Sequence, residues 1–156
     1  MEEQILTSFF RFEDLRVYHK SLDYYNWLME KVQNTDEFHR KALMVPFLDT
    51  AIKISMQIAD GSSNPKSDFI EYLKYAKGLV RQCVVFTSAA SQNGIFSEED
   101  VNFSRESLME MTKMLGAMIV SFQRSINSRK SENHKHRESK HDNADEFSTN
   151  ELEYNF

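Results

Sequence analysis

The sequence contains few of the residues that interrupt helices. Its 156 residues include only four glycines and two prolines, which argues against a fold made of many short strands. The single cysteine, Cys83, excludes an internal disulfide. We see no apolar run near the roughly 20 residues that span a bilayer, and no basic start followed by an apolar segment. We therefore expect a cytoplasmic protein made of a few long helices, with no membrane partner.

Length and charge set further limits. A chain of this size suits one domain with its own core, since domains are commonly about 100 to 150 residues long. The formal net charge is −5. Residues 1–128 carry 14 basic and 17 acidic side chains, and residues 129–156 carry 5 and 7. Neither part has the basic excess of a non-specific nucleic-acid binder, so that role would need a local patch.

Apolar periodicity predicts the first two helices. The first begins near Glu13 and ends near Asn34. Its expected core-facing seam, at steps of three and four, is Leu15, Tyr18, Leu22, Tyr25, Met29 and Val32. The second begins near Glu37, with a late start or a bent first turn at Pro46, because proline cannot donate a helical hydrogen bond. We expect it to stop at Gly61 in a left-handed cap.

Two further helices complete the pattern. The third should begin with Asn64 or Ser67 as its N-cap and end at Asn93 and Gly94. Its predicted seam is Phe69, Leu73, Ala76, Val80, Cys83 and Thr87. The fourth should begin with a capping box of Ser97 and Asp100 and run to near Ser128. Its predicted seam is Val101, Ser104, Leu108, Met111, Leu115, Met118 and Phe122.

These patterns predict an all-α protein whose residues 12–128 form an up-down-up-down antiparallel four-helix bundle. Residues 1–11 form an N-terminal arm with apolar residues close together, which should lie against the bundle or a neighbouring subunit. Residues 129–156 are polar and show no helical seam. We expect them to form a flexible C-terminal tail.

Candidate binding residues are few. Lys74, Lys77 and Arg81 recur at steps of three and four, so they share one face of the third helix, and Lys53 could join them from the second. Clustered cations can hold the phosphates of nucleic acid. A solvated helix face with Lys74 paired to Glu71 is the simpler interpretation.

The remaining chemistry-bearing residues point to no reaction. His134, His136, His141 and Asp142 form a histidine-rich run, but metal sites need ligands held in fixed geometry, so we expect a solvated segment. Cys83 falls on a predicted seam and should be a buried, inert thiol. We therefore expect no catalytic residue, no metal and no cofactor.

Surplus aromatic residues are more informative. Several large apolar side chains fall outside the four seams or in the arm: Phe9, Phe10, Phe12, Tyr24, Trp27 and Phe103. Some could fill the ends of the core. Cover by a second subunit is the alternative that we favour, which makes these residues candidates for an oligomer interface.

Three stretches also resemble a known family. FEDLRVYHKSL, IADGSSNPKSDFIEYLKYAKG and NGIFSEED are similar to the four-helix-bundle proteins first noticed in intervening sequences of 23S rRNA genes. That family includes the accessory variability determinant proteins of diversity-generating retroelements. The resemblance spans roughly residues 12–126. It implies a bundle that assembles into a barrel-like ring of five subunits, and, in the retroelement branch, a basic surface that associates with reverse transcriptase and nucleic acid.

The leading interpretation is a non-enzymatic, homo-oligomeric helical-bundle interaction module. A nucleic-acid or reverse-transcriptase partner, bound through Lys53, Lys74, Lys77 and Arg81, is a hypothesis attached to it. The alternative is a small-molecule or metal-dependent enzyme whose site forms between subunits. The two differ in whether purified protein holds stoichiometric metal and binds nucleic acid at low salt.

Overall fold

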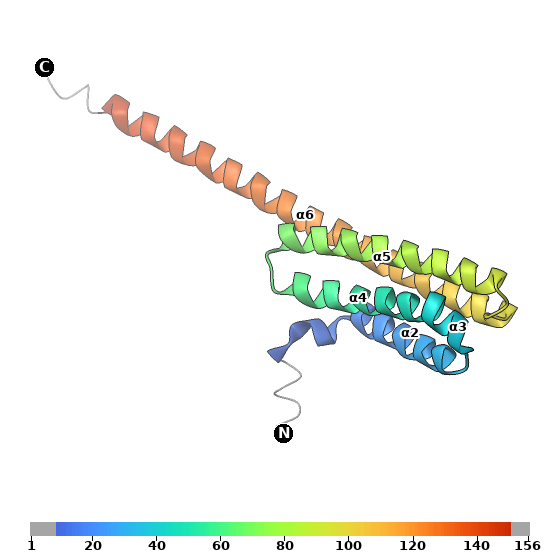
Figure 1. The fold of residues 1–156 in the computed structure, drawn as a ribbon. Helices are drawn as coiled ribbons and strands as arrows, with labels where there is room; N and C mark the ends of the chain where they lie inside the picture. The colour runs from blue at the N-terminus through green and yellow to red at the C-terminus, as the bar shows by residue number, and fades with distance from the viewer. Residues whose placement is uncertain (1–8, 151–156) are drawn as a thin grey trace, which may run out of the picture.

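The computed structural model describes residues 9–150, and the side chains of residues 9–140. Every regular element in this range is helical. In chain order the elements are a 3-10 helix η1 (Arg11–Asp14), α2 (Arg16–Gln33), α3 (Glu37–His39), a π-helical segment η2 (Arg40–Met44), α4 (Val45–Ser62), α5 (Lys66–Gln92) and α6 (Glu98–Asn150). Figure 1 shows α2, α4, α5 and α6 side by side. The predicted all-α fold with four long helices is confirmed.

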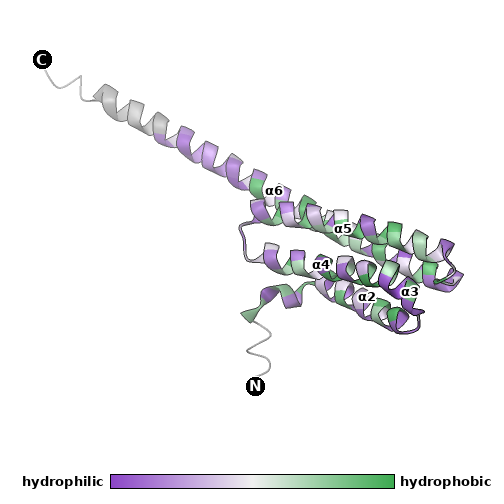
Figure 2. Ribbon diagram, viewed as in Figure 1, coloured by the Kyte–Doolittle hydropathy of each residue, from purple (hydrophilic) through white to green (hydrophobic). Residues whose placement is uncertain are grey.

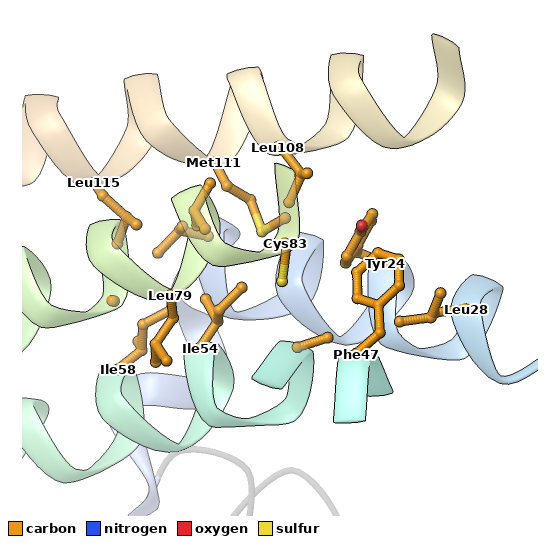
Figure 3. Packing of buried hydrophobic residues seen from close by; sticks show 14 of the residues in the cluster. Tyr24, Leu28, Phe47, Ile54, Ile58, Leu79, Cys83, Leu108, Met111 and Leu115 are labelled. Atoms are coloured by element: carbon orange, nitrogen blue, oxygen red, sulfur yellow. The ribbon is translucent and has the colours of Figure 1, made fainter. Parts of the chain in front are cut away.

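One apolar core joins the four long helices. Its large, fully buried side chains include Tyr24, Leu28, Phe47, Ile54, Ile58, Leu73, Val80, Leu108, Met111 and Leu115. In Figure 3 the labelled members of this cluster converge from all four helices on one interior. Burial of each such side chain contributes about 1.5 to 3 kcal/mol. The core therefore fixes how the four helices lie together.

The predicted seams of α5 and α6 agree with the structure. All six seam residues of α5 are buried, and the middle of the α6 seam, from Ser104 to Leu115, is buried as well. The capping box is present, with the Ser97 N–H donating to Asp100 Oδ2 at 3.1 Å and the Asp100 N–H donating to Ser97 Oγ at 3.1 Å. Gly94 ends the preceding turn at φ +70°, a conformation that favours glycine.

The predicted seam of α2 was wrong. The buried residues are Val17, Ser21, Tyr24, Leu28 and Val32. Of the predicted seam only Val32 is among them, and Met29 is exposed. Ser21 made the correct stripe look polar, yet its Oγ lies 2.7 Å from Ser55 Oγ inside the bundle. A satisfied hydroxyl is compatible with burial, so polarity alone misled the prediction.

The start of α4 accommodates Pro46 through a π-helical segment. Pro46 lies at the second residue of α4, and η2 precedes it directly. The Val45 N–H donates to the carbonyl of Arg40, five residues back. A wider turn at this point suits a residue that has no N–H of its own. The bent first turn expected at Pro46 therefore takes this form.

The expected roles of Gly61 and Asn64 were wrong. Gly61 lies inside α4, and among the described residues only Gly94 has a positive φ. A Cβ at Gly61 would lie 2.5 Å from Phe69 Cδ2 and 2.6 Å from Tyr72 Cβ. Glycine is needed here because α4 and α5 approach closely, not because of a left-handed cap.

The side chain of Asn64 closes α4 and does not cap α5. Its Nδ2 donates to the carbonyl of Asp60 at 2.9 Å. Pro65 precedes α5 without any side-chain cap bond, and Ser67 lies within that helix. The polar loop therefore serves the end of α4 that precedes it.

The predicted end of α6 near Ser128 was also wrong. The helix continues to Asn150, and Figure 1 shows this part projecting beyond the bundle. No glycine or proline follows Gly116 up to Asn150, so the sequence contains no strong stop signal. The expected boundary instead marks where α6 leaves the bundle, because residues 127–140 are all exposed.

The segment Glu37–Ser62 is, by length and composition alone, apolar enough to cross a membrane. This finding differs from our expectation that no stretch qualifies. Core helices of globular proteins pass the same test, and α4 packs Phe47, Ile54 and Ile58 into the core. Other apolar residues of α4, among them Val45 and Met56, are exposed and matter for the surfaces described next.

Candidate interaction surfaces

The three candidate cations of α5 differ in exposure and in their neighbours. Lys74 and Arg81 are exposed, whereas Lys77 is half-buried. The Lys77 Nζ lies 4.0 Å from the position that a Cβ on Gly116 would take, so this side chain reaches toward α6. Lys74 pairs with Glu71 at 3.1 Å, as the solvated-face interpretation predicts. One of the three cations on this face is therefore already neutralised by a neighbour on its own helix.

Lys53 lies away from this group. It is exposed on α4, and α4 approaches α5 on the side of Phe69 and Tyr72, whereas Lys77 lies toward α6. Sequence reasoning missed Arg105 of α6, whose Nη2 donates to Ser88 Oγ of α5 at 3.1 Å. Basic side chains of both α5 and α6 therefore reach across the contact between these helices, Lys77 toward Gly116 and Arg105 to Ser88.

Tyr24, expected at an oligomer interface, lies in the core. It is 1% exposed, and its hydroxyl lies 2.8 Å from Ser104 Oγ, which lies 2.7 Å from Thr87 Oγ1. Thr87 donates to the carbonyl of Cys83 at 2.8 Å, so Ser104 must donate to Thr87, and Tyr24 to Ser104. We call this run the hydroxyl chain. Burial raises the pKa of Tyr24, and the nearby Cys83 thiol adds to that effect.

Trp27 of α2 and Phe103 of α6 form an aromatic pair beside Tyr24, whose ring lies 5.7 Å from that of Trp27. Their rings lie 4.7 Å apart, Trp27 also packs 5.5 Å from Phe96, and Lys31 Nζ lies 5.7 Å from the indole ring. Trp27 is half-buried by these contacts, while Phe103 remains 44% exposed. Of this pair only Phe103 offers substantial surface to another molecule.

The aromatic residues of the N-terminal arm and of η1 lie at one end of α4. Phe9 and Phe10 are exposed, and Phe12 packs edge-on against Tyr18 with ring centroids 5.1 Å apart. Together with the end of α4, including Ala59, they border an open groove of about 540 Å³. The expectation that the arm lies against the bundle or a neighbouring subunit stays a prediction, and these contacts are consistent with its first alternative. Ile5 and Leu6 lie outside the described residues.

An apolar surface that we did not predict runs along α2 and α4. It consists of Tyr18, Leu22, Tyr25 and Met29 on α2 and of Val45, Leu48, Ile52, Met56 and Ala59 on α4, and we call it the α2/α4 apolar face. The Ser21–Ser55 hydrogen bond holds the two helices together beneath it. Residues at steps of three and four share one side of a helix. Met56 at 53% exposure is its most accessible member.

A polar pocket of about 310 Å³ lies where the α2–α3 and α5–α6 connections meet. In it, Lys31 Nζ pairs with Asp100 Oδ1 at 2.6 Å, and His39 Nδ1 with Asp36 Oδ1 at 2.7 Å. Hydrogen bonds from the ring and then the backbone N–H of His39 lower the pKa of Asp36. Burial opposes ionisation of Asp100, but hydrogen bonds from Lys31 and Ser97 outweigh it and lower the pKa. The charges in this pocket therefore satisfy one another.

Cys83 is buried in the core, as predicted. Burial raises the pKa of its thiol to about 12. The thiolate is the reactive form of cysteine, and its ordinary pKa is about 8.5. Near pH 8 the native protein therefore contains almost no thiolate at this position, which argues against a role as nucleophile.

We expect Cys83 to react with a disulfide reagent such as DTNB at pH 8 at least about 1,000-fold more slowly in the native protein than in 6 M guanidinium chloride. The slower rate combines the raised pKa with the lack of access to a fully buried sulfur. Absorbance at 412 nm follows the reaction. Release of one equivalent at the denatured rate from native protein would contradict this assignment.

Metal binding gains no support from the described part of the chain. Within it, no group of three or more His, Cys, Asp or Glu side chains is placed to hold an ion. His134 is paired with Glu138 on α6 at 3.1 Å. The side chains of His141 and Asp142 lie outside those described, so this finding covers only part of the histidine-rich run.

Comparison with protein-family models and with curated proteins finds no match to this chain. The resemblance to the intervening-sequence bundle proteins therefore stays a prediction from the sequence motifs.

Proposed function

We propose that this chain is a non-enzymatic interaction module that works as a homo-oligomer, with its subunits joined through the α2/α4 apolar face. The observation that carries the proposal is the continuity of this face along two adjacent helices. Its α4 side follows steps of three and four from Val45 to Ala59, and both Val45 and Met56 are exposed. Monomeric proteins rarely leave a contiguous apolar patch of this kind open to water.

A second copy of the chain is the partner that suits this face. Its members are aliphatic or aromatic, so the face offers no charge that would select an acidic or basic partner. Phe9 and Phe10 of the N-terminal arm, together with Phe12 of η1, lie beside its Ala59 end. These aromatic residues can therefore extend the α2/α4 apolar face of each subunit with an apolar rim.

The proposal includes details implied by the resemblance. We take the number of subunits to be five and the helix order to be up-down-up-down and antiparallel. The second point is supported by short connections, since only residues 34–36, 63–65 and 93–97 separate the helices. We keep the cytoplasm as the proposed location. A reverse-transcriptase partner stays a prediction.

The test is the mass of the protein in solution. Light scattering after size-exclusion chromatography should show an oligomer for the wild type. Met29→Glu with Met56→Glu places two carboxylates on the α2/α4 apolar face, both at exposed positions that the fold tolerates. Burying an unpaired charge in an interface costs more than about 1 kcal/mol at each site, so self-association should weaken at least about 30-fold.

Val85→Glu with Met109→Glu is the matched control. Both residues are exposed, on α5 and α6, and the change in net charge is the same. The control should keep the mass of the wild type. The proposal would be contradicted by a monomeric wild type. It would also be contradicted if both double variants dissociated to the same extent.

A further inference from the structure

The projecting part of α6 is a separate surface that the proposed function does not use. Residues 129–140 form a continuous stretch of helix, which we call the α6 arm, and all of its side chains are exposed. Figure 1 shows the arm leaving the bundle, and Figure 2 shows it as hydrophilic throughout its coloured length, unlike the helices of the bundle. Packing against the bundle therefore does not account for the composition of these residues.

The charge of the arm is hidden in the total for the tail. Residues 129–140 contain five Lys and Arg against two Glu, whereas the other five acidic residues of the tail all follow Lys140 in the sequence. A tail that is acidic on average therefore begins with a basic segment. Protonation of His134 and His136 would add two further cations to the arm.

The cations of the arm favour one side of the helix. Lys130, Asn133, His134 and Arg137 line one shallow groove, as their spacing of three and four predicts. At about 100° per residue, Lys140 lies within about 70° of the middle of this side. We call these five residues the basic side of the arm. Lys135 and Arg124 lie about 130° to 150° around the axis from its middle, on the opposite side of the helix.

The composition of the arm selects among polyanions. Helices that bind membranes need an apolar side to insert among lipid chains, and residues 127–140 contain no aliphatic or aromatic side chain apart from the two histidine rings. The arm therefore cannot insert into an acidic lipid surface and would be held there by charge alone. The phosphates of a nucleic acid remain, since they need only exposed cations and polar groups.

The shape of the arm selects among nucleic acids. An α-helix about 10 to 12 Å wide fits the major groove of B-form DNA, which is also about 12 Å wide. Twelve residues span about 18 Å, long enough to reach the phosphates on both sides of the groove. The major groove of A-form RNA is too narrow for side chains to enter. We propose that the α6 arm binds double-stranded DNA, with its basic side in the major groove.

The test uses the full-length protein and a fluorescent DNA duplex of about 20 base pairs, with binding measured by anisotropy from about 50 to 200 mM KCl. Lys130→Gln with Arg137→Gln removes two cations from the basic side and keeps good helix formers in place. Each lost phosphate contact lowers the slope of log K against log salt by about 0.9, so the slope should fall by about 1.8. Arg124→Gln with Lys135→Gln makes the same change in charge on the opposite side and should keep the slope.

Several results would overturn the proposal. These are no binding of the duplex at the lowest salt concentration, an equal loss of slope in both double variants, and binding of a matched RNA duplex as tight as that of the DNA. Binding to phosphatidylserine vesicles without binding to DNA would assign the arm to membranes instead. None of these outcomes depends on the subunit number, so failure here leaves the proposed self-association intact.

Discussion

Replacement of Phe47 by alanine is expected to lower the free energy of unfolding by about 3 to 5 kcal/mol. The side chain has no exposed surface, and its ring stacks on Phe86 with centroids 5.1 Å apart and an angle of 11°. It also lies 6.4 Å from Tyr24 and 6.0 Å from Phe96. Truncation would open a cavity among rings from three parts of the chain, which cannot all move in to fill it.

Phe38→Ala is the matched control, because it makes the same chemical change on the same segment. Phe38 is 74% exposed, so its removal should change the stability by less than about 0.5 kcal/mol. Urea unfolding followed by circular dichroism at 222 nm measures both variants. A loss of similar size in the two variants would show that Phe47 is not part of the core.

A methyl group at Gly61 is expected to cost about 2 to 3 kcal/mol of stability. The added Cβ would lie 2.5 Å from the Phe69 ring and 2.6 Å from Tyr72 Cβ. Tyr72 Cβ is fixed to the backbone of α5, and the Phe69 ring is buried, so neither can move away cheaply. Gly61→Ala would therefore have to push α4 and α5 apart.

Gly78→Ala is expected to change the stability in the opposite direction to Gly61→Ala. Gly78 lies inside α5, and a Cβ added there would meet nothing within 4 Å. Replacing a glycine by alanine within a helix usually stabilises it by about 0.5 to 1 kcal/mol. Thermal unfolding of the two variants gives a direct comparison. A stabilised Gly61→Ala variant would contradict the close approach of the two helices.

The parts of the fold predicted correctly are those where apolar period and capping chemistry agree. The six predicted seam residues of α5 are all buried, because only one stripe of that helix is apolar enough to face a core. The capping box of Ser97 and Asp100 is equally local, since both partners lie within one turn of helix. Neither prediction needed information from distant residues.

The side of α2 that faces the core could not be read from its own residues. The helix carries two stripes, one with Tyr18, Leu22 and Tyr25, and the other with Ser21 and Tyr24. The first has no charged or small polar member, so the period favours it. The second is buried because Ser21 finds a partner on α4 and Tyr24 one on α6. Such partners are separated by 34 and 80 residues, and one sequence gives no means of pairing them.

For the candidate surfaces, too, some features could be predicted from the local sequence and others required the structure. Exposure of Lys74 and Arg81 followed from the period of α5, but the α2/α4 apolar face emerged only once the true core side of α2 was known. The α6 arm was missed for a different reason. Averaging the charge over residues 129–156 combined the basic stretch that ends at Lys140 with the acidic one after it.

The hydroxyl chain of Tyr24, Ser104 and Thr87 limits how far the helices can slide past one another. Apolar side chains tolerate rearrangement at modest cost, so a one-turn shift of about 5.4 Å could still bury them. Hydroxyl groups bond only within about 3 Å. The same shift would leave the Tyr24 and Ser104 hydroxyls without partners in an apolar interior, at about 1 to 3 kcal/mol each, whereas Thr87 would keep its bond to the Cys83 carbonyl of its own helix. A single axial registry of α2, α5 and α6 is thus imposed by three oxygen atoms.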